Sequence, residues 1–201
     1  MNAFMILAII VLTLFIYDPE KTEKEVNFIQ KRNDIYYEPN QEEPYTGKYV
    51  SYYANGQKKE EGKYKNGKKE GLHVEWKENG CKNSSYEYKN GKLDGKADFR
   101  GGWRCEKWKI GQYKNGKKEG TWVHYYFTQE KESERNYING VLDGFFTSWH
   151  ENGQIASHGY GRCEKDIFWC DLFTNTLDER ARVGTWRFWD ENGNLEKEVT
   201  Y

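Results

Sequence analysis

A short string that recurs at nearly constant spacing constrains the fold of this chain more than any other feature. The pattern Tyr-x-Asn-Gly-x-x-acid-Gly occurs four times, starting at Tyr64, Tyr88, Tyr113 and Tyr137, at spacings of 24, 25 and 24 residues. A period of this length is the signature of repeat proteins, in which each unit buries its apolar face against its neighbours. We therefore expect an array of one repeated unit.

A second string supplies another turn in each unit. Trp-x-Glu-Asn-Gly begins at Trp76, Trp149 and Trp189, and Tyr53-Ala-Asn-Gly is a degenerate copy. Asn-Gly is the strongest short hairpin signal, because a type I′ turn needs positive φ at both central residues. Two turns per unit leave segments of about 8 to 11 residues, which is strand length. The prediction is an all-β fold, an elongated antiparallel meander of stacked hairpins with about 24 residues per unit.

Aromatic residues recur at two fixed positions of the unit. Counted from the glycine that closes the first turn, the second residue is Tyr49, His73, Ala97, Trp122, Phe146 or Trp186, and the fifth is Tyr52, Trp76, Arg100, Tyr125, Trp149 or Trp189. A regular strand sends these two positions to opposite faces, so we expect either a bulge or aromatic side chains on both faces. We interpret Tyr49, Trp122, Phe146 and Trp186 as exposed, and predict that they bind a protein partner.

The first 17 residues form a separate apolar segment, in which Ala3 to Tyr17 are apolar except for Thr13. This stretch is shorter than the roughly 20 residues of a membrane-spanning helix, and it lacks both a charged start and a small-x-small cleavage site. We interpret it as an uncleaved signal anchor or an atypical signal peptide, with a strand or helix packed on the domain as the alternative. Residues 18–43 are expected to be a polar tether.

The array occupies residues 44–201 and is interrupted once. After Gly161 the next closing glycine is expected near position 168, but it arrives at Gly184, so residues 162–183 hold an insert of about 16 residues. Long irregular loops in compact arrays are often functional. We predict that the aromatic side chains of this insert, Phe168 and Trp169, are further binding residues, with a decorative loop as the alternative.

The four cysteines do not have the spacing of a zinc site. Cys163 and Cys170 can face each other across the insert. Cys81 and Cys105 are one unit apart, which in a regular sheet means two strands and about 9.6 Å, beyond the roughly 7 Å reach of a disulfide. Both lie at turns of a distorted unit, however, where the sheet can pinch. Cys163–Cys170 and Cys81–Cys105 are therefore both candidate disulfides.

The net charge of −1 conceals an uneven distribution. Residues 45–120 hold 19 basic and 10 acidic side chains, a net charge of +9, whereas residues 121–201 hold 8 and 14, a net charge of −6. Lysines such as Lys58, Lys59 and Lys63 recur near the turns. They fit a solvated edge that prevents aggregation, a face for an acidic protein, or attraction to an anionic lipid or polymer. A nucleic-acid partner is not expected, because the aromatic side chains are needed for packing.

Motifs of catalysis are missing from the sequence. It contains no His-Glu-x-x-His zinc pair, no Gly-x-Ser-x-Gly elbow and no phosphate loop. The carboxylates of the first string (Glu70, Asp94, Glu119 and Asp143) are interpreted as turn residues that accept hydrogen bonds from backbone amides. We predict no catalytic residue, no metal and no cofactor, and expect that the protein is not an enzyme.

The string Pro44-Tyr45-Thr46-Gly47-Lys48-Tyr49, the Tyr-x-Asn-Gly-x-x-x-Gly copies and the Gly-x-x-x-x-Trp spacing resemble bacterial MORN-variant repeats. Such repeats make up the YwqK family, named as antitoxin components of toxin–antitoxin modules. The resemblance covers residues 44–201 and implies a β-meander that binds a protein, such as a cognate toxin, without catalytic residues. The apolar start, in which this chain departs from a plain cytosolic antitoxin, predicts a membrane-associated or exported protein of the bacterial envelope, and the side of the membrane stays open. The alternative function is a scaffold that binds an anionic membrane or polymer, and the oligomeric state stays open.

Overall fold

The computed structural model describes residues 25–102, 104–163 and 177–201. Three short strands come first: β1 (Glu25–Val26), β2 (Gln30–Arg32) and β3 (Ile35–Tyr37). The repeats then form β4 (Gly47–Tyr52), β5 (Lys58–Lys65), β6 (Lys68–Trp76), β7 (Lys82–Lys89), β8 (Lys92–Gly101), β9 (Glu106–Lys114), β10 (Lys117–Tyr125), β11 (Lys131–Ile138), β12 (Val141–Trp149), β13 (Ile155–Arg162), β14 (Arg182–Trp189) and β15 (Leu195–Thr200). A 3-10 turn, η2 (Glu179–Ala181), precedes β14.

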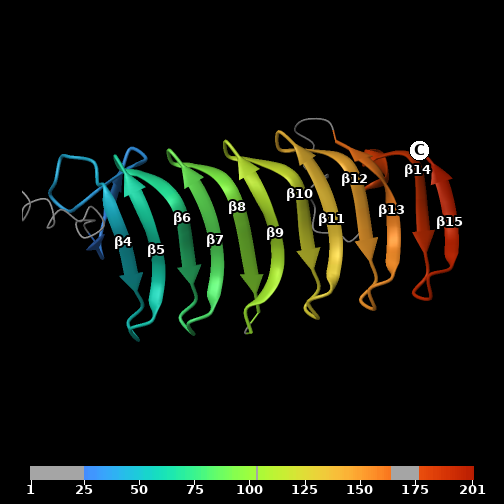
Figure 1. Ribbon diagram of the computed structural model, residues 1–201, viewed down its shortest axis with the longest axis horizontal. Coiled ribbons are helices and arrows are strands. Elements are labelled where there is room, and N and C mark those ends of the chain that lie inside the picture. Colours follow the sequence, from blue (N-terminus) through green and yellow to red (C-terminus); the bar gives the residue numbers. More distant parts are fainter. Residues whose placement is uncertain (1–24, 103, 164–176) are drawn as a thin grey trace, which may run out of the picture.

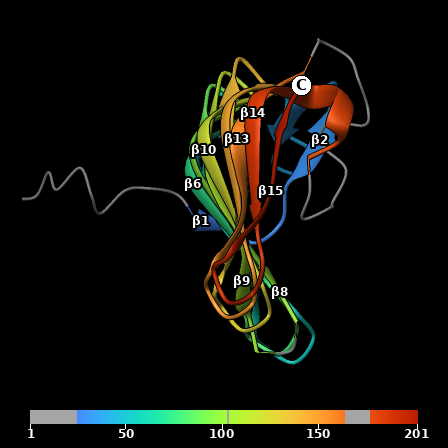
Figure 2. The same cartoon turned by 90° about the vertical axis from the view of Figure 1, so that its right-hand side faces the viewer.

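All of these strands except β2 and β3 form one long sheet, and β2 and β3 pair with each other in a separate antiparallel sheet. The 13 strands of the long sheet follow the order β1-β4-β5 and so on to β15, and each pair from β4 onward is antiparallel, whereas β1 runs parallel to β4. Figure 1 shows the hairpins side by side along the long axis, and Figure 2, along that axis, shows them nearly superposed. The predicted all-β elongated meander of hairpins is confirmed.

The first set of Asn-Gly turns has the expected geometry. We call the turns that follow β5, β7, β9 and β11 the upper turns, because they lie at the upper edge in Figure 1. At the first of them Asn66 and Gly67 both have positive φ, at 51° and 69°, and the same holds at 90–91, 115–116 and 139–140. These are type I′ values, which the strand twist favours in two-residue hairpins.

The lower turns follow β4, β6, β8, β10, β12 and β14, and those that contain Asn-Gly use the asparagine differently from our expectation. At the first lower turn only Gly56 has positive φ, at 83°, and the Tyr53 amide donates to the Gln57 carbonyl over 2.8 Å. This is a longer loop with a glycine bulge rather than a type I′ turn. Asn55 serves through its side chain, which accepts from the Gln57 amide and donates to the Glu78 carbonyl of the next lower turn.

A bulge follows every lower turn, on the second strand of each hairpin. In the first hairpin Ser51 pairs with Glu60 and Tyr52 pairs with Lys58, so Lys59 is the extra residue. The same register shift occurs at Glu75/Trp76, Phe99/Arg100, His124/Tyr125, Ser148/Trp149 and Phe188/Trp189. The bulged residue belongs to the partner strand, so the strand that carries the second and fifth positions alternates regularly and places them on opposite faces. Of the two expected alternatives, aromatic side chains on both faces is the one that occurs.

The second-position side chains form the core, which we call the inner row: Tyr49, His73, Ala97, Trp122, Phe146 and Trp186. The prediction that Trp122, Phe146 and Trp186 are exposed binding residues is wrong, because all three have 0% exposed surface. Only Tyr49 is half-buried. Truncation of rings buried in this way typically costs about 3–5 kcal/mol, so these residues stabilise the fold.

Glycines on the neighbouring strands make this burial possible. A Cβ added to Gly111 would lie 2.2 Å from the Trp122 ring, so the indole rests directly on the backbone of β9. Its Nε1–H donates to the Gln112 carbonyl over 3.1 Å. The Tyr113 ring, with a centroid separation of 5.0 Å, closes the other side. Gly62 beneath His73 and Gly159 beneath Trp186 repeat this arrangement.

Three of the four carboxylates of the first string accept hydrogen bonds from backbone amides, as predicted, and these amides belong to the upper turn of the next unit. Glu70 accepts from the Asn90 amide over 2.8 Å. In the same way, Asp94 accepts from Asn115 over 3.0 Å and Glu119 from Asn139 over 2.9 Å. The fourth carboxylate, Asp143, instead accepts from the Tyr160 hydroxyl and from Arg162, because no Asn-Gly turn follows β13.

The region expected to be a tether is partly folded. Strand β1 pairs with β4, and the Tyr36 amide donates to the Gly67 carbonyl over 2.9 Å. The Tyr36 and Tyr64 rings are 4.8 Å apart. Residues 25–43 therefore pack on the first hairpins, while the apolar segment and the rest of the tether lie outside the described residues.

The insert returns to the core at its end. Gly161 stands where the other units have the tyrosine of the first string, and a Cβ there would lie 2.5 Å from the Leu177 side chain. Leu177 and Ala181 are each 3% exposed, so they fill the place of the missing ring. The predicted binding residues Phe168 and Trp169, like Cys170 of the Cys163–Cys170 pair, lie outside the described residues.

Candidate binding surface

The fifth-position side chains form a second line of rings on the outer face. We call Tyr52, Trp76, Tyr125, Trp149 and Trp189 the outer aromatic row; Arg100 takes this position in the third hairpin. Lysines of neighbouring hairpins lie over the rings: Lys58 over Trp76 at 5.6 Å, Lys107 over Tyr125 at 5.7 Å and Lys131 over Trp149 at 5.4 Å. At such distances a cation is attracted to the ring face.

The outer aromatic row includes exposed apolar surface. Tyr52 at its start is 51% exposed. Ile155 and Leu195, which pair in register with Trp149 and Trp189, are 42% and 54% exposed. An aromatic stripe with exposed apolar neighbours is the composition that protein interfaces favour.

The lysines predicted to bind a partner already have contacts within the sheet. The Lys58 ammonium lies 2.7 Å from a Glu61 carboxylate oxygen, and Lys59 lies over the Tyr53 ring at 5.7 Å. Lys63 is exposed on β5, and its backbone carbonyl accepts from His73. The positive charge of residues 45–120 is thus partly neutralised by neighbouring carboxylates. Exposed ion pairs of this kind contribute little to stability.

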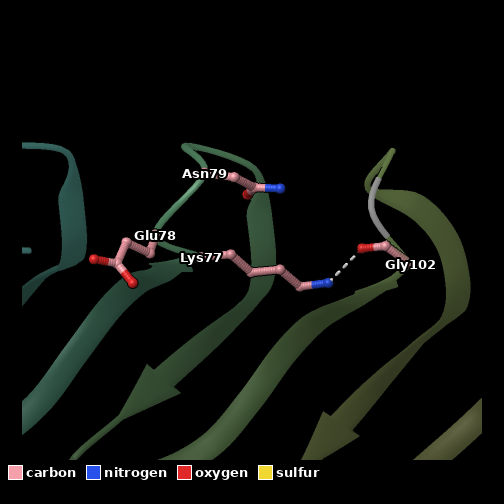
Figure 3. A pocket seen from close by; sticks show the side chains of 4 residues that line it. All are labelled: Lys77, Glu78, Asn79 and Gly102. Atoms are coloured by element: carbon pink, nitrogen blue, oxygen red, sulfur yellow. Dashed lines mark hydrogen bonds between the residues drawn. The ribbon is translucent and has the colours of Figure 1, made fainter. Parts of the chain in front are cut away.

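The distorted unit lies next to a disulfide. Cys81 and Cys105 are joined, with a Cα–Cα distance of 5.6 Å, so the sheet does pinch between the second and third lower turns. A shallow hollow of about 630 Å³ lies beside them. Figure 3 shows Lys77 crossing it to donate to the Gly102 carbonyl over 2.8 Å, while Glu78 points the other way. Because Lys77 already spans this hollow, it is not the strongest binding site.

A deeper groove of about 440 Å³ lies between the third and fourth lower turns, and we call it the lower groove. Its lining includes the aromatic residues Trp108, Tyr125, Tyr126 and Phe127 and the carboxylates Glu106, Glu132 and Glu151. Phe127 is 84% exposed and Trp108 is 42% exposed. Burial raises the pKa of Glu132 above its ordinary value.

Sequence reasoning missed the lower groove, although a signal for it exists. The residue after each outer aromatic position usually reaches the next unit: Tyr53 donates to the Trp76 carbonyl and Tyr126 to the Trp149 carbonyl, each over 2.8 Å. In the third hairpin this residue is Gly101, which has no side chain to span the gap. An alignment of the units at this position would have located the groove.

The remaining titratable groups suit packing rather than chemistry. Burial lowers the pKa of His73 from 6.5 to about 4, so the ring is neutral and donates from Nε2 to the Lys63 carbonyl over 2.8 Å. Within the described ranges, no three His, Cys, Asp or Glu side chains are grouped so that they could hold a metal ion. No helix in this part of the chain is long and apolar enough to cross a membrane.

These features define the class of the protein, a β-meander repeat array whose unit boundaries are hairpin turns. Residues 45–66, which include β4 and β5, and residues 182–201, which include β14 and β15, match the family model described as MORN repeat variant. The match and the fold support a MORN-repeat protein, and repeats of this kind are generally associated with modules that bind proteins or membranes. A search of the curated proteins finds no match.

Proposed function

We propose that this protein is a non-catalytic binding module whose outer aromatic row docks a protein partner. The observation that carries the proposal is the division of aromatic residues between two faces. The inner row and the glycines beneath it account for the core, whereas the outer aromatic row adds large rings to the solvent side of a single sheet. Large, partly rigid rings of this kind are the residues that dominate binding energy at protein interfaces.

We propose two candidate partners for this module. The resemblance to antitoxin components implies a toxin protein as the first partner to test. Binding to an anionic lipid or polymer is the second candidate, and the net charge of +9 over residues 45–120 favours it. The two candidates differ in salt dependence, because the Debye length falls from about 10 Å at 0.1 M to about 3 Å at 1 M ionic strength.

The test is crosslinked capture of partners by the full chain at these two salt concentrations. A variant with Tyr52→Ala, Ile155→Ala and Leu195→Ala removes one exposed ring of the outer aromatic row and the exposed side chains that pair with two others. The matched control, Leu72→Ala, removes a side chain that is 56% exposed on the same face but outside this row. We expect a protein partner that survives high salt, is lost with the triple variant and is retained by the control.

A charge-reversed variant separates the alternative. Replacement of Lys58, Lys59 and Lys63 by Glu should weaken binding to vesicles that contain anionic lipid, and high salt should do the same. If the only binding found is to such vesicles and disappears at high salt, the protein-binding proposal is wrong. It is also wrong if the triple variant captures the same partner as the wild type.

A further inference from the structure

The lower groove exists because one unit lacks a side chain that its neighbours have. Tyr53 and Tyr126 each bridge to the following unit, and His150 makes the equivalent contact with the Trp189 carbonyl at 2.8 Å. Gly101 cannot form such a bridge. The third and fourth lower turns are linked at this point by Gln129, whose side chain bonds the backbone of Lys107. The space beside this link stays open.

Carboxylates outnumber basic side chains in the lining of the lower groove, although Arg135 also attracts Glu132. Glu106, Glu132 and Glu151 line it together with a single lysine, Lys107. One oxygen of Glu106 is buried and has no hydrogen-bond partner among the described residues. A buried carboxylate oxygen without a partner is unfavourable, and so is the ionised form of Glu132, whose pKa is raised by burial. A bound cation would provide a partner for the Glu106 oxygen and would stabilise the ionised form of Glu132.

The rings of the groove suit the same ligand. The Lys107 ammonium lies 5.7 Å from the centroid of the Tyr125 ring. The Lys109 ammonium lies 5.3 Å from the centroid of the Trp108 ring, so both rings already form cation–π contacts. Phe127, 84% exposed, extends this surface at the rim of the groove. A planar guanidinium can stack on a ring and donate to carboxylates at its edge, which an ammonium does less well.

We infer that the lower groove binds an arginine side chain of the protein partner. An acidic side chain would meet three carboxylates of like charge, and an apolar side chain would leave the Glu106 oxygen without a partner. The guanidinium supplies the missing donors, and its stem packs against Phe127. This inference rests on the proposed function, since it names the group that the partner presents at one point of the sheet.

The test uses two matched probes, the peptides acetyl-Gly-Arg-Gly-amide and acetyl-Gly-citrulline-Gly-amide, which differ in charge but hardly in shape. They are titrated into the isotope-labelled full chain and followed by NMR. We expect saturable shifts at the Trp108 indole and at the amides of residues 125–128, with the arginine peptide binding at least about tenfold more tightly. A net difference of about 1.5 kcal/mol for a charge-assisted hydrogen bond gives this factor.

Variants locate the site. Glu106→Gln keeps the shape of the side chain and should weaken the arginine peptide about tenfold, whereas Glu78→Gln, on the second lower turn, should leave its affinity unchanged. Gly101→Tyr restores the bridging side chain and should abolish binding. Equal affinity for both peptides, or unchanged binding by Glu106→Gln, would overturn the inference.

The inference and the proposed function fail in different ways. If arginine binds in the groove but no protein capture depends on the outer aromatic row, the proposed function falls and the site stands. If capture depends on Tyr52, Ile155 and Leu195 but Glu106→Gln changes neither capture nor peptide binding, the proposed function stands and the arginine site is rejected.

Discussion

The neutral histidine in the core makes the stability of the second unit depend on pH. His73 is 2% exposed, and its Nδ1 faces the backbone of Gly62, where an added Cβ would lie 2.1 Å away. Burial lowers its pKa from 6.5 to about 4. At 1.36 kcal/mol per pKa unit, this difference corresponds to about 3 kcal/mol.

The sign follows from which state binds the proton first. Between about pH 6.5 and pH 4 the unfolded chain carries a proton on His73 and the folded chain does not, so stability falls as the pH falls through this window. Above about pH 6.5 both states are neutral, and below about pH 4 both are protonated, so the dependence vanishes at either side.

The control is His73→Phe, because the same position holds Phe146 in another unit. The variant loses the hydrogen bond to Lys63 at every pH, which shifts its stability by a constant amount. The difference between wild type and variant therefore isolates the titration of His73 from that of the carboxylates. It should be level above about pH 6.5 and fall by about 3 kcal/mol toward pH 4.

The readout should be local, because repeat arrays need not unfold as one unit. Hydrogen exchange of the β5, β6 and β7 amides, corrected for intrinsic exchange rates, gives the free energy of opening around His73. A difference curve that stays level from pH 8 to about pH 4 would show that His73 titrates near its ordinary pKa, and the burial argument would be refuted.

Two further predictions concern stability. Gly159→Ala should lower the free energy of unfolding by about 1–3 kcal/mol, because the new methyl group would lie 2.2 Å from the Trp186 ring. Thermal denaturation should show little change for the control Gly101→Ala, whose nearest neighbouring atom lies 3.9 Å away; similar losses at both sites would contradict the packing described. Replacing Cys81 and Cys105 by Ser should cost about 3.5 kcal/mol in urea unfolding, the loop-closure value for a separation of 24 residues. An unchanged midpoint would mean that this bridge does not stabilise the array.

The fold was predictable because its turns are encoded locally. The Asn-Gly pairs and the 24-residue period define strand length and strand order without any tertiary information, and the turn carboxylates such as Glu119 bond as expected. The lower turns differ because Asn55 stabilises its turn through side-chain hydrogen bonds, and not by adopting a positive φ. The repeat pattern alone does not distinguish these two uses of asparagine.

The binding face was less predictable, because burial in a single sheet depends on the neighbouring strand. Trp122 is buried since Gly111 opposite it has no side chain, and this pairing joins residues that are 11 positions apart. Sequence parity correctly separates Trp122 from Tyr125, but it does not say which of the two faces is packed. The size of the residue on the neighbouring strand decides that. The lower groove likewise depends on an absent side chain, because Gly101 has none to bridge to the next unit.

The carboxylate links give the array a direction. Glu70 comes before the turn at Asn90 that it caps, and Asp94 and Glu119 likewise precede the turns at Asn115 and Asn139. During synthesis the upstream residue leaves the ribosome first, so each new upper turn meets an acceptor that is already in place. For each of these three turns, the carboxylate that accepts from the turn amide is synthesised before the turn itself. Such an arrangement suits vectorial folding, in which each hairpin is added to a finished edge.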